Sequence, residues 1–181
     1  MAQAPESWDR QAVHDEFDRV QADFHRLLSQ ATAADLARRT DGTKWTNEQL
    51  LFHMLFGYMI VRALLPFMAV AVRLPDGASR GYARLLNAAT GPFDLINYLG
   101  PCVAVHVYGH RRMAAKLDRV LAGLRRRLDN ASTGDLARGM SYPTRWDPFF
   151  SGGHMTLADL FRYPTQHYDF HRRQLTFTTP A

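Results

Sequence analysis

Four long stretches of apolar residues at helical spacing constrain the fold of this 181-residue chain more than any other feature. In each stretch, large apolar side chains recur every three or four residues, as they do along one face of an amphipathic α-helix. Little of the chain alternates as a strand would. We therefore predict an all-α four-helix bundle in a single domain, residues 1–181. The expected helices cover about Asp9 to Gln30, Asn47 to Met68, Cys102 to Asp129 and Leu157 to Leu175.

The segment between the second and third expected helices is less regular. Glycines and prolines recur between about Leu74 and Pro101, which predicts a longer crossover with one short helix near Arg80 to Ala89. Pro66 lies inside the second helix and is expected to kink it or to end its regular part. The segment from Tyr142 to Gly153 is expected to be an ordered connection.

Composition narrows the class of protein. A hydrophobic content of 46% with 22% charged residues is typical of a soluble globular domain. Cys102 is the single cysteine, which excludes an intramolecular disulfide and a cysteine-based zinc site. The N-terminal residues lack the features of a signal peptide, and the apolar run from Leu50 to Val72 contains Arg62. We expect a cytoplasmic protein that does not associate with a membrane.

The chain is basic, with a formal net charge of +5 and a pI near 9.7. Much of the excess positive charge lies in the third expected helix. A basic helix face can attract nucleic acid or an anionic ligand, but it can also be the solvated outer face of a bundle helix. Aromatic interleaving, a helix-turn-helix pattern and a glycine-rich phosphate loop are all lacking in the sequence, so we favour the solvated face and expect no nucleic-acid partner. The excess charge lies mainly in Arg111, Arg112, Lys116, Arg119, Arg125, Arg126 and Arg127.

Three histidines are the strongest candidates for chemistry. His167 and His171 are four residues apart, which places both imidazoles on one helix face, and His53 lies on the apolar face of the second helix. If the apolar faces of these helices point into the bundle, the three histidines would meet and bind one divalent metal. Three protein ligands would leave one coordination position open, as in catalytic sites. The alternative is that they are core histidines hydrogen-bonded to carbonyls or carboxylates. Spacing alone does not decide between the two.

A second pair, His106 and His110, has the same spacing of four. These histidines could line the same cavity, contribute a ligand, or lie in water near a helix end. Gly109 precedes His110 and favours the helix end.

Two segments, KWTNEQLLFHM and MTLADLFRYPTQHYDFHRRQL, resemble the DinB-like (DinB/YfiT-type) family of metal-binding four-helix-bundle proteins. In that family a Trp-(Ser/Thr)-x-x-(Glu/Gln) start leads into a helix with one ligand histidine, and a final helix carries two more. The matching residues are Trp45, Thr46 and His53 in the first segment, and Leu157, Asp159, His167, His171 and Gln174 in the second.

The resemblance implies that His53, His167 and His171 bind zinc or nickel, and that the protein is a homodimer. For some members it implies a metal-dependent transferase or isomerase that uses a low-molecular-weight thiol such as bacillithiol or mycothiol; other members have no known activity. An apolar excess on the first two helices also permits a dimer. Pro164 and the long crossover depart from the usual pattern of the DinB-like family, and we expect them to reshape the mouth of the pocket at the three histidines.

Three functions therefore remain open: a metal-dependent transferase acting on a small molecule, a non-catalytic metal-binding protein with a stress-related or regulatory role, and a structural or nucleic-acid-associated bundle. No catalytic or cofactor-binding residue is assigned. Candidates for supporting roles are Gln166, Asp169 and Gln174 for orienting a ligand histidine, Tyr163 and His110 as acid or base, and Arg172 and Arg173 for binding an anion.

Overall fold

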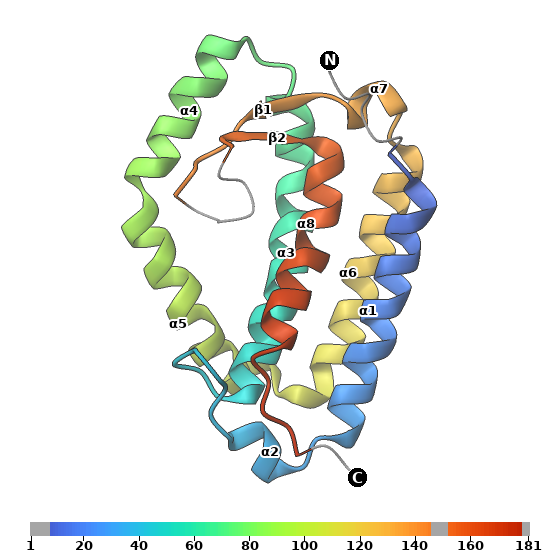
Figure 1. Ribbon diagram of the computed structural model, residues 1–181, viewed down its shortest axis with the longest axis vertical. Coiled ribbons are helices and arrows are strands. Elements are labelled where there is room, and N and C mark those ends of the chain that lie inside the picture. The colour runs from blue at the N-terminus through green and yellow to red at the C-terminus, as the bar shows by residue number, and fades with distance from the viewer. Residues whose placement is uncertain (1–7, 146–151, 179–181) are drawn as a thin grey trace.

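A bundle of four long helices forms the body of the protein (Figure 1). The computed structural model describes residues 8–145 and 152–178. The predicted all-α fold is confirmed. α3 packs against α6 and α8, and α1 packs against the same two helices. The four helices of the bundle are α1 (Arg10–Gln30), α3 (Asn47–Ala71), α6 (His110–Asn130) and α8 (Leu157–Arg172).

α3 is the central helix of the bundle, and most of its first half is buried. Among the described residues, α3 alone has the length and hydropathy of a membrane-spanning helix. Many of its apolar side chains belong to the core, and α3 packs against α5 (Thr90–Tyr108), α6 and α8, which is what a central bundle helix requires. The largest fully buried side chains of the core include Phe17, Phe24, Leu50, Met54, Tyr58, Met113, Leu117, Leu121, Phe161 and Tyr168.

Short elements connect the long helices, and the sequence patterns did not predict them. α2 (Ala33–Ala37) follows α1, and α7 (Thr133–Leu136) follows α6. Two three-residue strands, β1 (Gly139–Ser141) and β2 (His154–Thr156), pair in antiparallel register immediately before α8. They fix the point at which α8 enters the bundle.

The crossover is more regular than the sequence predicted. It consists of α4 (Asp76–Ala88) and α5 (Thr90–Tyr108), which swing away from the bundle and return beside α3 (Figure 1). The expectation that glycine and proline would interrupt any long helix here is wrong. Pro92 lies in the first turn of α5, where its missing N–H would have no helical partner. Pro101 lies in the interior, and α5 continues through it while packing against α3.

The third expected helix, Cys102 to Asp129, is divided in two. Gly109 has a φ of 59°, a conformation that L-residues with a side chain rarely adopt, and it separates α5 from α6. His106 and His110 therefore lie on different helices rather than one turn apart on one face.

The other interrupting residues have smaller effects. α3 continues past Pro66 to Ala71, so Pro66 does not end it. In the expected ordered connection, the Tyr142 N–H donates to the Gly153 carbonyl (2.9 Å), and residues 146–151 lie outside the described part of the chain.

Candidate metal centre

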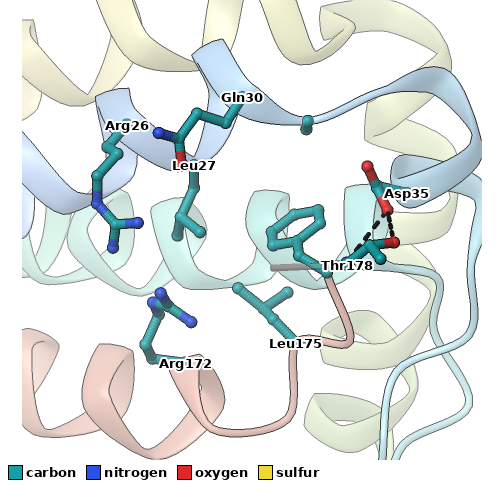
Figure 2. A pocket seen from close by; sticks show the side chains of 9 residues that line it. Arg26, Leu27, Gln30, Asp35, Arg172, Leu175 and Thr178 are labelled. Atoms are coloured by element: carbon teal, nitrogen blue, oxygen red, sulfur yellow. Dashed lines mark hydrogen bonds between the residues drawn. The ribbon is translucent and has the colours of Figure 1, made fainter. Parts of the chain in front are cut away.

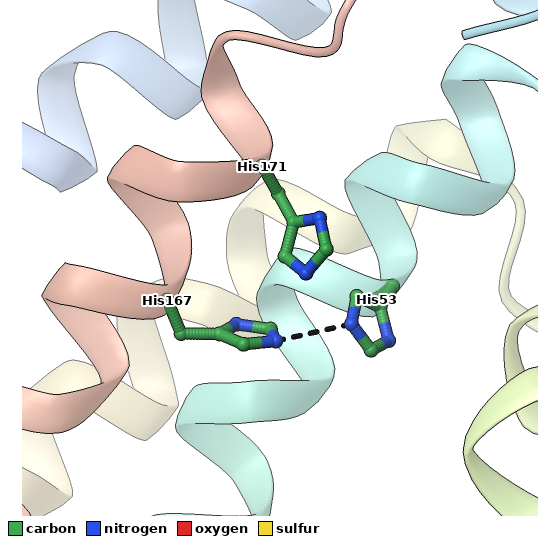
Figure 3. Close-up of side chains that lie close together, drawn as sticks. All are labelled: His53, His167 and His171. Carbon is green, nitrogen blue, oxygen red and sulfur yellow. Dashed lines mark hydrogen bonds between the residues drawn. The ribbon is translucent and has the colours of Figure 1, made fainter. Parts of the chain in front are cut away.

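The bundle brings the three predicted histidines together. His53 projects from α3, and His167 and His171 project from successive turns of α8, so that the rings converge between the two helices (Figure 3). His53 and His167 are buried, with 3% and 8% of their surfaces exposed, and His171 is partly exposed. The cluster is therefore closed on the core side and open beside His171.

Each helix that carries a ligand starts at a well-defined residue. Thr46 and Gln49 form a capping box at the start of α3, and Thr156 and Asp159 form another at the start of α8. A fixed start sets the rotational phase of a helix, and this phase decides which residues face the neighbouring helix. The capping boxes thereby help to aim the histidines at one another.

The distances in the cluster suit a single cation. One ring nitrogen from each histidine lies within 4.8 Å of the others. The Nε2 atoms of His53 and His167 are 3.0 Å apart. Two nitrogen ligands of a tetrahedral Zn²⁺ are separated by roughly 3.3 Å, given bonds of about 2.0–2.1 Å. Three protein ligands would leave a fourth position open.

The electrostatic environment keeps the two buried rings neutral. Burial lowers the pKa of His53 to about 2, and the neighbouring His167 and His171 act in the same direction. Burial likewise lowers the pKa of His167 to about 3, with a further contribution from His171. A metal ligand must be a neutral imidazole, so the rings are held in the form that binds a cation.

Gln174 fixes the orientation of His171. The His171 Nδ1 lies 2.7 Å from the Gln174 Oε1, and an amide oxygen only accepts a hydrogen bond. The proton of His171 is therefore on Nδ1, which leaves the lone pair on Nε2 for a cation. The Gln174 carbonyl accepts from the Asp41 N–H (2.9 Å), and this contact holds the segment after α8 in place.

The hydrogen bonding of the other two histidines indicates that they fit a metal ion. The buried Nδ1 atoms of His53 and His167 have no hydrogen-bond partner among the described residues. Leaving a buried polar atom unsatisfied costs about 1–3 kcal/mol. If both Nδ1 atoms carry protons, the two Nε2 lone pairs face each other at 3.0 Å, an arrangement that a shared cation would stabilise.

Residues around the cluster hold the rings in place. The Trp45 ring lies 4.5 Å from the His53 ring, centroid to centroid, and the Trp45 Nε1 donates to the Tyr98 carbonyl (3.2 Å). Gly57 faces His167 so closely that a Cβ atom on it would lie 2.9 Å from the His167 Nδ1. Sequence reasoning missed the roles of Gly57 and Tyr98. The position of Gly57, one turn after His53, was the available signal.

Of the residues proposed for supporting roles, the structure places some beside the histidine cluster and others away from it. Gln174 contacts a ligand histidine, whereas Asp169 binds Arg19 instead (3.0 and 2.8 Å) and Gln166 is exposed. The Tyr163 ring lies 5.8 Å from the His167 ring, so it borders the cluster.

Neither arginine candidate, Arg172 nor Arg173, contacts the histidine cluster through an interaction found among the described residues. Arg172 pairs with Asp23 (2.8 Å) and projects into a separate pocket opposite Arg26 (Figure 2), while Arg173 is exposed. The Asp23 carboxylate also accepts from Tyr168 (2.7 Å). Arg172 therefore ties α8 to α1.

The second histidine pair lies at another place. His106 and His110 line a pocket of about 570 Å³ beside the N-terminal end of α3. The Nδ1 of His110 lies 3.3 Å from the Glu48 Oε1. The group of described residues that could hold a metal consists of His53, His167 and His171, without this pair.

Comparison with known proteins gives a match at the level of the family. No curated protein and no solved structure matches the chain. The family model of the DinB superfamily matches residues 16–175, which include the four long helices apart from the first turns of α1, and all three histidines. The chain belongs to the DinB superfamily.

Proposed function

We propose that this protein is a metal-dependent transferase that joins a low-molecular-weight thiol to a small electrophilic substrate. The observation that carries the proposal is the cluster of three histidines, two of them buried and neutral, with an open side. A divalent cation at such a site lowers the pKa of a thiol or water in its open position and so supplies a nucleophile at neutral pH. Zinc and nickel are the metals we favour.

The residues of the chain would bind the metal, orient its ligands and border the place of the substrate. His53, His167 and His171 are the proposed ligands, and Gln174 holds His171 in the tautomer that binds. Trp45 covers one side of His53 and limits the access of water from that side. Tyr163 borders the cluster from α8, with its ring 5.8 Å from the His167 ring, and is the candidate for holding a substrate or moving a proton.

Metal analysis of the untagged protein tests the site. We expect about one equivalent of zinc or nickel in wild-type protein. His167→Ala should lose it, because His167 is a central member of the cluster. The matched control is His14→Ala: His14 pairs with Asp129 at the surface (2.8 Å), and this variant should retain the metal. A wild-type protein that neither retains nor binds a divalent metal would contradict the site.

A screen of thiols tests the reaction. The metal-loaded protein is incubated with bacillithiol, mycothiol or another small thiol and a panel of electrophiles, and thiol consumption is followed. Turnover that disappears in His167→Ala supports the transferase. Metal binding without thiol-dependent turnover would instead support the alternative function, a non-catalytic metal-binding protein with a stress-related or regulatory role.

We also propose that two copies of the chain associate through α5. Large apolar side chains on α5 are exposed at helical spacing, among them Leu99 at 46%. Leu99→Glu should convert a dimer to a monomer in light scattering, whereas Leu74→Glu, with 47% exposure outside this strip, should not. A monomeric wild type would contradict the proposal. The strip consists of Leu95, Ile96, Leu99, Val103 and Val107.

For localisation, we propose the cytoplasm. The burial of most of the first half of α3 in the core supports a bundle helix over a membrane span. Cell fractionation tests this: the protein should be found in the cytosolic fraction, and recovery with membranes after a salt wash would contradict it.

A further inference from the structure

A cavity of about 350 Å³ that is open to solvent lies between α3 and α6, and basic side chains line it from both helices. Its walls are two helical stripes that face each other. On α3 the lining residues recur at intervals of three and four, and on α6 they are four and seven residues apart, so each set shares one helix face. The lining residues are Met59, Arg62, Ala63 and Pro66 on α3, and Lys116, Val120 and Arg127 on α6.

The three cations of this cavity have no acidic partner within the described part of the chain. Other arginines nearby do: Arg125 on α6 pairs with Asp18, and Arg73 pairs with Asp135 (2.5 and 2.6 Å). Lys116 lies 5.7 Å from the centre of the Tyr108 ring, a contact that leaves its charge in place. Unpaired like charges that share one cavity repel each other, and a bound anion would offset this repulsion.

Gly123 gives Arg62 its position. This buried residue of α6 lies between Val120 and Arg127 on the same stripe. A Cβ atom at Gly123 would lie 2.6 Å from the Arg62 Nε and 3.2 Å from its Cζ. The Arg62 side chain therefore lies directly against the α6 backbone, where any other residue would displace it. Glycine in a helix interior costs about 0.5–1 kcal/mol relative to alanine, so the close approach accounts for a residue that helix stability alone would disfavour.

The cavity is distinct from the metal centre. Arg62 follows His53 by nine residues, which at about 100° per residue places it on the opposite side of α3. His53, His167 and His171 are absent from the lining of the cavity.

We propose that this cavity binds the phosphate group of a small phosphorylated molecule. A guanidinium donates two parallel hydrogen bonds to phosphate oxygens, and a lysine ammonium adds a point charge. Arg62, Lys116 and Arg127 supply both kinds of group from two directions. The apolar walls at Met59, Pro66 and Val120 leave room for the organic part of the molecule. The basic face of the third predicted helix thus has a ligand-binding part rather than being only solvated.

Calorimetric titration of the full-length protein with inorganic phosphate and with phenyl phosphate tests the proposal. We expect saturable binding of the phosphates that chloride at equal ionic strength does not reproduce. Arg62→Gln should weaken binding about tenfold or more, as expected for loss of a charge-assisted contact. Arg126→Gln is the matched control, because Arg126 is an exposed residue of α6 outside the cavity, and it should bind as wild type does. Binding that is unchanged in Arg62→Gln and in Lys116→Gln would overturn the proposal.

The Gly123→Ala variant tests the position of the Arg62 side chain while its charge is kept. The new methyl group would displace only the flexible end of Arg62, so the protein should fold with a melting temperature no lower than wild type, while phosphate binding weakens. Phosphate binding equal to wild type in this variant would contradict the positioning of Arg62 by Gly123.

A lipid headgroup and a soluble metabolite could both carry the phosphate. Co-sedimentation with phosphatidylcholine vesicles containing phosphatidic acid distinguishes them. Sedimentation that depends on Arg62 indicates a headgroup, and binding of phenyl phosphate without sedimentation indicates a soluble ligand. Absence of both overturns the site.

Discussion

At the scale of single residues, the histidine cluster depends on neighbours that are not ligands. Gly57 makes room for the His167 ring, and Gln174 selects the tautomer of His171. Such supporting residues typically change metal affinity by 10- to 100-fold when they are replaced, because they fix the orientation of the ligands.

Gly57→Ala should weaken metal binding by roughly tenfold or more. Its Cβ atom would lie 2.9 Å from the His167 Nδ1 and would push the ring from its position. Affinity is measured by competition with a chromogenic zinc chelator. Gly81→Ala is the control, because a Cβ atom at Gly81 in α4 meets no neighbour within 4 Å. Equal affinities for wild type and Gly57→Ala would contradict the role of Gly57.

The buried histidines should make the metal-free protein less stable in acid. The pKa of His53 is about 2 and that of His167 about 3 in the folded state, against an ordinary value of 6.5. Between these limits the unfolded chain binds more protons than the folded one. The stabilisation is therefore complete above pH 6.5 and is lost as the pH falls toward the folded values, by up to about 1.4 kcal/mol per pH unit for each histidine.

Urea denaturation of metal-free protein between pH 7 and pH 4 measures this effect. His53→Gln should reduce the slope of unfolding free energy against pH by about 1.4 kcal/mol per unit, since glutamine does not titrate in this range. His14→Ala serves as the control for loss of a surface histidine. The same slope in wild type and His53→Gln would count against a buried neutral His53.

At the scale of elements, the two helices that carry ligands and α1 are those the sequence predicted best. α1, α3 and α8 begin within a residue or two of their expected starts, and the structure places the N-cap residues Asp9, Thr46 and Thr156 there. α4, α5 and the division between α5 and α6 were predicted poorly. Glycine and proline weaken a helix locally, and only packing against the rest of the protein decides whether it continues through them.

Removal of the α8 cap should destabilise the protein without changing the ligands. Thr156 accepts a hydrogen bond from the Asp159 N–H (3.1 Å), and the Asp159 carboxylate accepts from the Thr156 N–H (2.8 Å). Thr156→Ala should therefore cost about 1 kcal/mol of unfolding free energy, measured by urea denaturation. Thr133→Ala, in the short helix α7, is the comparison, and its cost should be within about 0.5 kcal/mol of zero. A stability for Thr156→Ala that equals wild type would show that the cap is dispensable.

At the scale of the whole molecule, a bound metal should stabilise the fold, because its ligands come from two helices more than a hundred residues apart in the chain. The cluster exists only when α3 and α8 are packed, so the metal binds the folded state preferentially. At a free concentration about 100 times the dissociation constant, this linkage contributes about 2.7 kcal/mol.

Zinc should accordingly raise the melting temperature of the metal-free wild type in differential scanning fluorimetry, and a chelator should reverse the change. His53→Ala should show no such rise. An equal rise in both proteins would indicate that zinc acts elsewhere than at the histidine cluster.

The sequence by itself determined the helical class and the starts of the ligand-bearing helices. It also determined which three histidines are the candidates for a shared metal site. These features follow from local rules: side-chain periodicity, capping chemistry and a spacing of four residues on one face. They need no knowledge of how distant segments pack.

The tertiary structure alone decided the rest. It placed the His53 and His167 Nε2 atoms 3.0 Å apart, put Gly57 beneath one ring, and separated His106 and His110 from the site. It also set Arg62 against Gly123, on the side of α3 opposite to His53. Contacts of this kind depend on the relative rotation and depth of packed helices, which many side chains determine together and no short segment encodes.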